Sequence, residues 1–258
     1  MNDAIPDSSI PAVTLVFSGD LLDFFKDSGG SSYVYHYPLL RRASIKDIVE
    51  SLGIPHTEIG RLSYNRKELD FSFVPAGSER LLVEPLSPLY PPTRPSTLRP
   101  ESLNEIRFLV DVNVGKLVRL LRMAGLDATA ALENQSIKAI AADGATDGRI
   151  LLSRNRDLLK LRSVVFGRLI RSQDPTRQFI EVSHLFNLPS LYHPFSRCMA
   201  CNGVLHPVDK ADILDRLEPL TIRYYHRFHQ CGSCGRLYWR GSHHDHMVRT
   251  FGFTEPEE

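Results

Sequence analysis

The 258-residue sequence predicts an α/β protein with three parts: a small mixed N-terminal domain, a central domain and a cysteine-rich C-terminal module. Three observations predict this organisation. A proline-rich stretch divides the chain between residues 85 and 100, strand-like and helix-like segments alternate after it, and all four cysteines lie near the C-terminal end. With 42% hydrophobic and 24% charged residues, the composition is that of a folded globular protein and excludes disordered and fibrous chains.

The N-terminal domain is predicted over residues 11–86. In the helix predicted over 44–53, four apolar residues recur at helical spacing, with Ser44 as N-cap and Gly53 as the stop. The strands predicted around this helix are Val13–Phe17, Tyr33–Tyr37, Leu69–Val74 and Arg80–Val83. The order of two strands, one helix and two strands favours a small sheet with one helix packed across it.

Residues 87–106 are predicted to be a semi-rigid linker, because repeated prolines remove amide donors and favour extended chain. The central domain is predicted over residues 107–190. Its strands are predicted at Arg107–Val112, Arg149–Leu152 and Val164–Ile170, and its helices at Lys116–Ala124, around Ile137 and at Pro175–Phe186. Strands separated by helices indicate a mostly parallel sheet, whose ligands bind at the carboxyl ends of the strands.

The charge of the chain is unevenly distributed although the net charge is only +1. Residues 107–180 contain 13 Lys and Arg against 7 Asp and Glu, whereas residues 1–106 contain 10 against 14. A basic central part is typical of proteins that bind a polyanion such as RNA, and also of solvated basic faces. Because the sequence shows neither a membrane span nor a secretion signal at its start, we expect no membrane contact and a cytoplasmic location.

The four cysteines form two CxxC pairs, Cys198/Cys201 and Cys231/Cys234, each with a glycine close after its second cysteine. Paired knuckles of this spacing predict a structural Zn²⁺ site, because four thiolates complete a tetrahedral shell. Redox chemistry at each pair is the alternative. The histidines of the run 241–246 are expected to be exposed residues near this site, or a second metal site, and Tyr238 and Trp239 to be core or RNA contacts.

Three aspartates are candidate ligands of a Mg²⁺ or Mn²⁺ ion that assists phosphodiester hydrolysis. Asp111 ends an apolar strand, where a buried charge is costly unless it binds a ligand or accepts hydrogen bonds, or caps the next turn. Asp157 and Asp174 are weaker candidates because each is also explained as a helix N-cap or first-turn acid.

Basic residues surround these acids in two groups. Lys116, Arg119 and Arg122 are three residues apart in the helix that follows Asp111, so we expect them on one helix face. Arg154 and Arg156 follow the next strand. Both groups are predicted to hold an RNA backbone near the strand ends.

The segments FLVDVNVGKLVRLLRMAGLDA, GRILLSRNRDLL, RSQDP, RCMACNG and CGSCGRLYWRGSH together resemble the Mut-7 C-terminal RNase family. That family has a PIN-fold α/β/α nuclease domain with a zinc ribbon, here expected over 191–250. The stretch SIKDIVESLGIPHTEIG resembles the ubiquitin-like β-grasp (α+β) domain often fused before it. The resemblance implies a metal-dependent ribonuclease, with Asp111 matching the first acid of the family and Mg²⁺ or Mn²⁺ as the catalytic ion.

The sequence departs from the family pattern at the expected acids. The family usually has threonine-arginine-aspartate after the second strand, whereas this chain has Ser153-Arg154-Asn155, so that Asn155 offers the metal a neutral oxygen. Where an acidic pair is expected before the Ile137 helix, Glu133 is followed by Asn134. Fewer carboxylates bind divalent ions more weakly. The alternative function is therefore a PIN-like protein that binds RNA or a ribonucleoprotein without cleaving it.

The N-terminal domain also departs from the sulfur-carrier proteins related to it, which need a free C-terminal Gly-Gly. Here the single Gly-Gly, Gly29-Gly30, is internal. We therefore expect no thiocarboxylate chemistry, and instead a module that docks a protein partner or contacts RNA. A third hypothesis is an interaction scaffold that recruits a protein partner without RNA.

Overall fold

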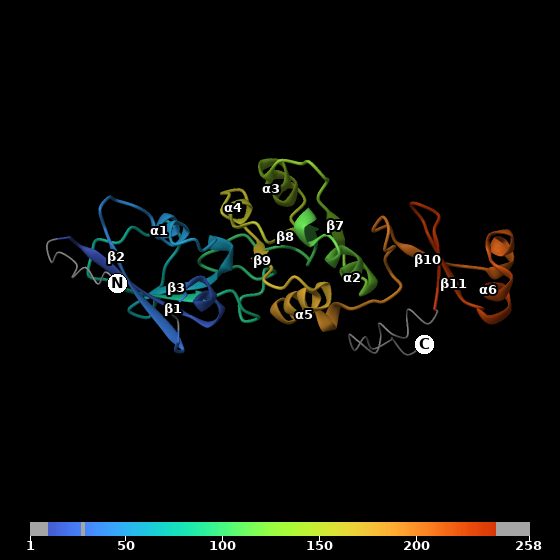
Figure 1. Ribbon diagram of the computed structural model, residues 1–258, viewed down its shortest axis with the longest axis horizontal. Coiled ribbons are helices and arrows are strands. Elements are labelled where there is room, and N and C mark those ends of the chain that lie inside the picture. Colours follow the sequence, from blue (N-terminus) through green and yellow to red (C-terminus); the bar gives the residue numbers. More distant parts are fainter. Residues whose placement is uncertain (1–9, 27–28, 241–258) are drawn as a thin grey trace. The chain divides into compact units, whose positions relative to one another are not determined.

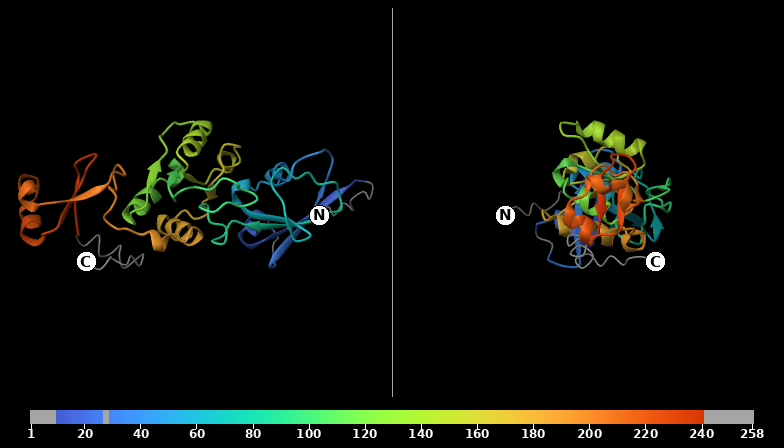
Figure 2. Two further views of the ribbon diagram at one scale, coloured as in Figure 1. Left: turned by 180° about the vertical axis from the view of Figure 1, so that it is seen from behind. Right: turned by 90° about the vertical axis from the view of Figure 1, so that its right-hand side faces the viewer.

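The computed structural model describes residues 10–26 and 29–240, and the chain divides into two compact units. The first unit joins Met1–Glu105 to Gln135–Leu169, and the second joins Ile106–Asn134 to Ile170–Glu258. Figures 1 and 2 show the elements of both units in chain colours. Within the described ranges, no helix is long and apolar enough to span a membrane. Part of the predicted central domain thus belongs to the same compact unit as the N-terminal domain.

The first unit contains a mixed sheet with the strand order β2-β1-β5-β3-β4. The strands are β1 (Ala12–Ser18), β2 (Ser32–Pro38), β3 (Ile59–Tyr64), β4 (Lys67–Glu68) and β5 (Arg80–Pro85). β1 pairs antiparallel with β2 and parallel with β5, and β3 pairs antiparallel with β5. A mixed sheet of this order with one helix across it confirms the predicted ubiquitin-like fold class of the N-terminal domain.

Helix α1 (Ile45–Ser51) covers one face of this sheet and closes its core (Figure 1). As predicted, Ser44 is the N-cap, and its hydroxyl accepts the backbone amide of Asp47. Ile48 and Val49 of the helix and Leu15 of β1 are fully buried. Burying one such side chain stabilises a fold by about 1.5–3 kcal/mol, so this face accounts for much of the stability of the domain.

The third strand along the chain is β3. The sequence instead predicts a strand at Leu69–Val74. Residues 69–74 alternate apolar and polar side chains as strands do, but Asp70 accepts the amide and the hydroxyl of Ser72 and folds the segment into a turn. Gly60 interrupts the apolar pattern of β3. A Cβ at Gly60 would lie 2.4 Å from the Pro85 carbonyl oxygen, and the register with β5 shifts at this point. The close approach of the backbones therefore explains the glycine that hides the strand.

The proline-rich stretch after β5 folds back onto the first unit. Leu98 joins the hydrophobic core, and Arg99 is only 6% exposed. The Arg99 guanidinium donates to the carbonyls of Ile59 at 2.9 Å, Thr57 at 3.2 Å and Val165 at 3.1 Å. Burial lowers the pKa of Arg99 to about 10, against the opposing effect of Glu58. The stretch predicted as a linker is thus an ordered structural part of the unit.

The second segment of the first unit contributes α3 (Ile137–Thr146), β8 (Ile150–Ser153), α4 (Arg156–Leu159) and β9 (Gly167–Leu169), of which β8 and β9 pair parallel. Glu58, which is completely buried, attaches this segment to the N-terminal domain. Its carboxylate accepts the Leu169 amide at 2.8 Å and the Arg168 guanidinium at 3.0 Å. Arg168 also donates to Asp20 at 2.7 Å. A buried guanidinium thus has two carboxylate partners in the N-terminal domain.

His56 makes a further contact within the first unit. Its Nδ1 lies 2.7 Å from the Glu50 carboxylate, and its Nε2 lies 2.8 Å from the Val164 carbonyl oxygen. The ring thus links α1 of the N-terminal domain to the chain just before β9.

The second unit contains β6 (Phe108–Val110), α2 (Leu117–Met123), β7 (Ala128–Ala130) and α5 (Pro175–Leu185). β6 and β7 pair parallel, which agrees with the predicted α/β class. Gly125 ends α2 with a φ of +84°, and a Cβ there would lie 2.1 Å from the His193 carbonyl oxygen. Only glycine fits this left-handed and crowded position, which explains why the helix predicted over Lys116–Ala124 ends where it does.

The C-terminal module of this unit is a small antiparallel sheet in the order β10-β11-β12. Its strands are β10 (Leu205–Val208), β11 (Phe228–Cys231) and β12 (Leu237–Trp239). Between β10 and β11 lie η5 (Lys210–Arg216) and α6 (Pro219–Tyr224), coloured orange to red in Figures 1 and 2. Phe228 of β11 is buried with Ile213 and Leu217, which gives the sheet a small core of its own.

Candidate functional site

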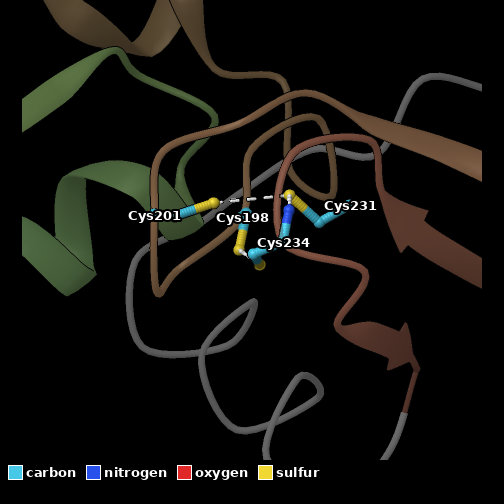
Figure 3. Close-up of side chains that lie close together, drawn as sticks. All are labelled: Cys198, Cys201, Cys231 and Cys234. Atoms are coloured by element: carbon cyan, nitrogen blue, oxygen red, sulfur yellow. Dashed lines mark hydrogen bonds between the residues drawn. The ribbon is translucent and has the colours of Figure 1, made fainter.

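The four cysteines meet at one point, with Cys231 at the end of β11 (Figure 3). Cys198 Sγ lies 3.6 Å from Cys234 Sγ, Cys201 Sγ lies 3.4 Å from Cys231 Sγ, and all four sulfurs lie within 4.8 Å of one another. Thiolates bound to Zn²⁺ at about 2.3 Å in a tetrahedron lie about 3.8 Å apart. The sulfur positions therefore fit a metal ion such as Zn²⁺ with a closed shell.

Tight turns present the two pairs of thiols to one another. In the first, the Asn202 amide donates to the Cys198 carbonyl, and in the second the Gly235 amide donates to the Cys231 carbonyl. Asn202 and Gly235 both have φ near +70°, the conformation that closes such turns. A Cβ at Gly203 would lie 2.8 Å from Cys231 Sγ, so the close approach of the turns requires a glycine.

Tyr238 of β12 supports the first pair by donating its hydroxyl to Cys198 Sγ at 3.1 Å. Burial alone raises the pKa of the Cys198 thiol, but this hydroxyl and backbone amides outweigh burial and lower the pKa to about 6. Burial and the nearby Cys198 raise the pKa of Tyr238 to about 12. The surroundings of Cys198 thus favour the thiolate form that binds metal ions, whereas at Cys201 the Gly203 amide is outweighed by the neighbouring Cys231 thiol, which raises the pKa to about 12.

Arg122 and Asn202 fasten the first cysteine turn to α2 and β7. Arg122 donates to the carbonyls of Met199 at 3.1 Å and Ala200 at 2.8 Å, and its Nε donates to the Ala128 carbonyl. Asn202 accepts the Ala128 amide with its side-chain oxygen. These hydrogen bonds join the C-terminal module to the β6–β7 part of the second unit.

The prediction that Arg122 binds the RNA backbone is therefore wrong. Arg122 is only 7% exposed, and burial lowers its pKa against the raising effect of Cys198 and Cys201. The reason lies in helix geometry, because a spacing of three residues falls about 60° short of a full turn at each step. Arg122 is thus rotated by about 120° from Lys116, which places it on the inner side of α2. Lys116 and Arg119 are exposed.

Asp111 follows β6 directly and is only 4% exposed. Its side chain does not cap the 3-10 helix η3 (Val112–Val114), which excludes one explanation given for it above. Its Oδ2 accepts the side-chain amide of Asn113 at 2.6 Å. Asp111 is thus a buried carboxylate at the carboxyl end of a parallel strand, the position at which α/β folds bind ligands.

Asn155 and Asp157 lie at the start of α4 in the first unit. Asn155 is the N-cap, and its Oδ1 accepts the amides of Asp157 at 2.9 Å and Leu158 at 3.2 Å. Asp157 is exposed in the first turn of this helix. Both residues therefore have a structural role at the helix N-terminus, and Arg154 and Arg156 beside them are exposed.

Asp174 begins α5, where its Oδ1 accepts the Arg177 amide at 2.9 Å. Asp174 is thus the helix N-cap, which is one of the roles predicted for it from the sequence.

The four cysteines are, within the described ranges, the one set of three or more candidate ligands whose donor atoms lie within 4.8 Å of one another. The histidine run 241–246 lies outside the described residues.

Several functional contacts have no signal in the sequence. The partners in the Glu58–Arg168 ion pair are 110 residues apart, and no motif marks either of them. Arg99 is hidden among prolines that favour an exposed linker, and the role of Asn202 is obscured because turns commonly contain asparagine. A pattern search finds ligands that recur at fixed spacing, but it does not find such long-range pairs.

Comparison with known proteins gives two matches to family models. Residues 106–251 match the model of the Mut7-C RNAse domain, and residues 10–89 match the model of the Mut7-C ubiquitin domain. Both matches agree with the resemblance drawn from the motifs and with the predicted order of the domains. No curated protein and no solved structure matches the chain.

Proposed function

Since the chain belongs to the Mut7-C RNAse domain family, we propose that it cleaves RNA phosphodiester bonds with a divalent ion held by Asp111 and further carboxylates. The observation that carries the proposal is the burial of Asp111 at the end of β6. Burying a carboxylate costs several kcal/mol unless other groups compensate it. The Asn113 amide compensates part of this cost at Asp111, and a bound cation would compensate it further.

The donor chemistry suits Mg²⁺ or Mn²⁺, which take oxygen ligands. Asp111 would hold the ion, with Asp174 of the same compact unit as a further carboxylate. Asp174 would serve through Oδ2, because its Oδ1 accepts the Arg177 amide. Asn155 is the least suited of the four candidates, since its only acceptor atom already receives two backbone amides. When bound, the ion would activate water and neutralise charge on the leaving oxygen.

The remaining residues of the site would orient the substrate and the acid. The Asn113 amide holds one oxygen of Asp111 and so fixes the direction of the carboxylate. The exposed side chains of Lys116, Arg119, Arg154 and Arg156 would bind phosphates of the RNA backbone. Zn²⁺ at the four cysteines would be structural, because four protein ligands leave no open position for water or substrate.

The test compares the zinc-loaded protein with Asp111→Asn on labelled transfer, ribosomal and unstructured RNAs. The assay runs with Mg²⁺, with Mn²⁺, and with neither ion; a chelator is avoided because it also removes zinc. We expect cleavage to require the ion and to fall at least about 100-fold in Asp111→Asn, as for loss of a group that stabilises the transition state. Asp147→Asn is the matched control, because Asp147 is an exposed acid at the end of α3. Equal cleavage by Asp111→Asn would contradict the proposal.

A second candidate function is RNA binding without cleavage. The observation in its favour is Asn155, an amide at a position where the family usually has an acid, and one already used as a helix cap. RNA binding that weakens with salt, with no cleavage in either ion, would support this function.

A further inference from the structure

The C-terminal module carries a concentration of positive charge that neither the proposed active site nor the zinc site uses. Residues 216–240 contain five arginines and one acid, Glu218. Residues 191–215 of the same module contain two basic and three acidic residues. The charge is thus confined to the part formed by α6, β11 and β12.

Exposed aromatic rings occur in the same part of the module. Tyr224, at the end of α6, is 63% exposed, and Trp239, at the end of β12, is 36% exposed. The Trp239 ring lies 6.3 Å from that of Tyr225, and the Arg223 guanidinium lies 5.5 Å from the Tyr224 ring centre. Tyr225 packs against the core of the module, and the Trp239 ring lies 6.0 Å from that of the core residue Phe228, so each of these rings also has a packed side. The exposed area of the rings adds little to folding.

Exposed aromatic rings among arginines form a surface suited to single-stranded RNA. Bases stack on aromatic rings, and guanidinium groups bind phosphates or stack on bases. Aromatic and arginine residues also occur in protein interfaces, but their surplus positive charge here is complementary to a polyanion. We therefore propose that the α6–β12 surface, made of Arg223, Tyr224, Tyr225 and Trp239, binds a single-stranded segment of RNA by stacking.

This inference deepens the proposed function and rests on RNA being the substrate. It assigns the C-terminal module a second role beside its metal site. The two cysteine turns hold β11 and β12 in place, and Trp239 at the end of β12 contacts the RNA. The surface would choose substrates with an unpaired segment, because bases in a duplex do not expose their faces for stacking.

The chain contains a single tryptophan, so that Trp239 reports directly on this surface. A short single-stranded RNA is titrated into the full zinc-loaded protein without Mg²⁺ or Mn²⁺, while tryptophan emission and the anisotropy of a label on the RNA are recorded. We expect quenching of Trp239 that follows the anisotropy curve, and weaker binding of a duplex of the same length. Anisotropy that rises without quenching would place the RNA elsewhere and overturn the inference.

Two variants and one control make the test specific. Tyr224→Ala and Trp239→Ala are expected to weaken binding about tenfold each, as for loss of one stacked base. Leu220→Ala is the matched control, because Leu220 is apolar, lies on the same helix and is 68% exposed. Trp239→Phe keeps a ring and is expected to bind within about threefold of the parent protein.

Arg223→Gln provides an independent measurement. If Arg223 contacts a phosphate, the slope of log affinity against log salt falls by about 0.7 in this variant. Equal RNA affinity in Tyr224→Ala, Trp239→Ala and the parent protein would overturn the inference and leave the surface to a protein partner. Because these assays contain neither Mg²⁺ nor Mn²⁺, they are independent of cleavage. Binding by a parent protein that does not cleave RNA when Mg²⁺ or Mn²⁺ is added contradicts only the ribonuclease proposal.

Discussion

Glu58 shows how strongly one residue can connect distant parts of this chain. Its carboxylate is fully buried and binds Arg168 and the Leu169 amide, more than 100 residues away in the sequence. Removing one partner of a buried ion pair leaves the other charge without compensation, which usually costs more than the pair itself contributes. The first unit thus depends on this carboxylate.

We predict that Glu58→Gln lowers the free energy of unfolding by about 3 kcal/mol. The expected loss is at the lower end of the usual range because Arg168 keeps its bond to Asp20 at 2.7 Å. The measurement is urea denaturation followed by far-ultraviolet circular dichroism.

Glu68→Gln is the matched control for this prediction. Glu68 pairs with Arg61 at 3.0 Å, but both side chains are more than a third exposed. Solvent weakens such a pair, so that we expect a change below about 1 kcal/mol. Similar losses in both variants would show that burial of Glu58 adds nothing to its ion pair.

At the scale of elements, the sequence predicts best where a local pattern determines the structure. Helix α1 begins after Ser44 as predicted, and the spacing of the cysteines predicts a cluster that the structure contains. Prediction fails where a distant contact decides. Gly60 hides β3 because its neighbour is the Pro85 carbonyl, and Arg122 turns inward to reach the carbonyls at the first cysteine turn.

In the candidate active site, too, local patterns predict some features and miss those that depend on distant contacts. Asp111 is predicted from the apolar strand before it, and its burial agrees with that reasoning. The sequence also offers helix capping for Asp174, and the structure contains that cap, whereas the cap at Asn155 is not predicted. Whether capping residues also bind metal depends on the directions of their remaining lone pairs, which no local pattern determines.

The small sheet of the C-terminal module has few apolar side chains around its cysteines. Next to the cysteines, its core consists of Cys198, Cys231 and Leu205 with Tyr238 packed against them. The separate core around Phe228 stabilises the sheet, but so few apolar side chains beside the cysteines cannot offset the entropy of ordering the two turns. We therefore expect a metal bound at the four cysteines to supply much of the stability of the two turns.

We predict that removal of the metal shifts the emission of Trp239 to longer wavelength, because β12 loses its pairing with β11 and the ring becomes hydrated. Adding Zn²⁺ is expected to restore the emission, whereas adding Mg²⁺ is not, since thiolates prefer the softer ion. Cys234→Ser is expected to resemble the metal-free protein. Emission that is the same with and without metal would contradict a structural role for the site.

At the scale of the whole molecule, the boundaries of the compact units differ from those of the matched domains. The Mut7-C RNAse match begins at residue 106, but residues 135–169 within it form one compact unit with the N-terminal 105 residues. Arg168, Val164 and Val165 of this segment bind Glu58, His56 and Arg99 respectively. The ubiquitin-like domain is therefore a structural partner of the nuclease sequence.

We predict that deletion of residues 1–105 unfolds β8 and β9, because Arg168 is then left without Glu58 and Asp20, and the Val164 and Val165 carbonyls lose their donors. Hydrogen exchange measures this directly: amides of residues 150–153 and 167–169 are expected to exchange at least about 100-fold faster than in the full chain, since the loss of a buried ion pair alone costs about 3–5 kcal/mol.

Cleavage of the full chain at Leu89 is the matched control for this deletion, since Leu89 is 82% exposed and breaking the chain there removes none of these contacts. The two fragments are expected to elute together in gel filtration and to keep the slow exchange of β8 and β9. If the N-terminal domain were a docking module on a linker, the fragments would separate, and the shortened protein would exchange as slowly as the full chain. That result would mean that β8 and β9 fold without the buried hydrogen bonds that Glu58 and Arg99 make to residues 165–169.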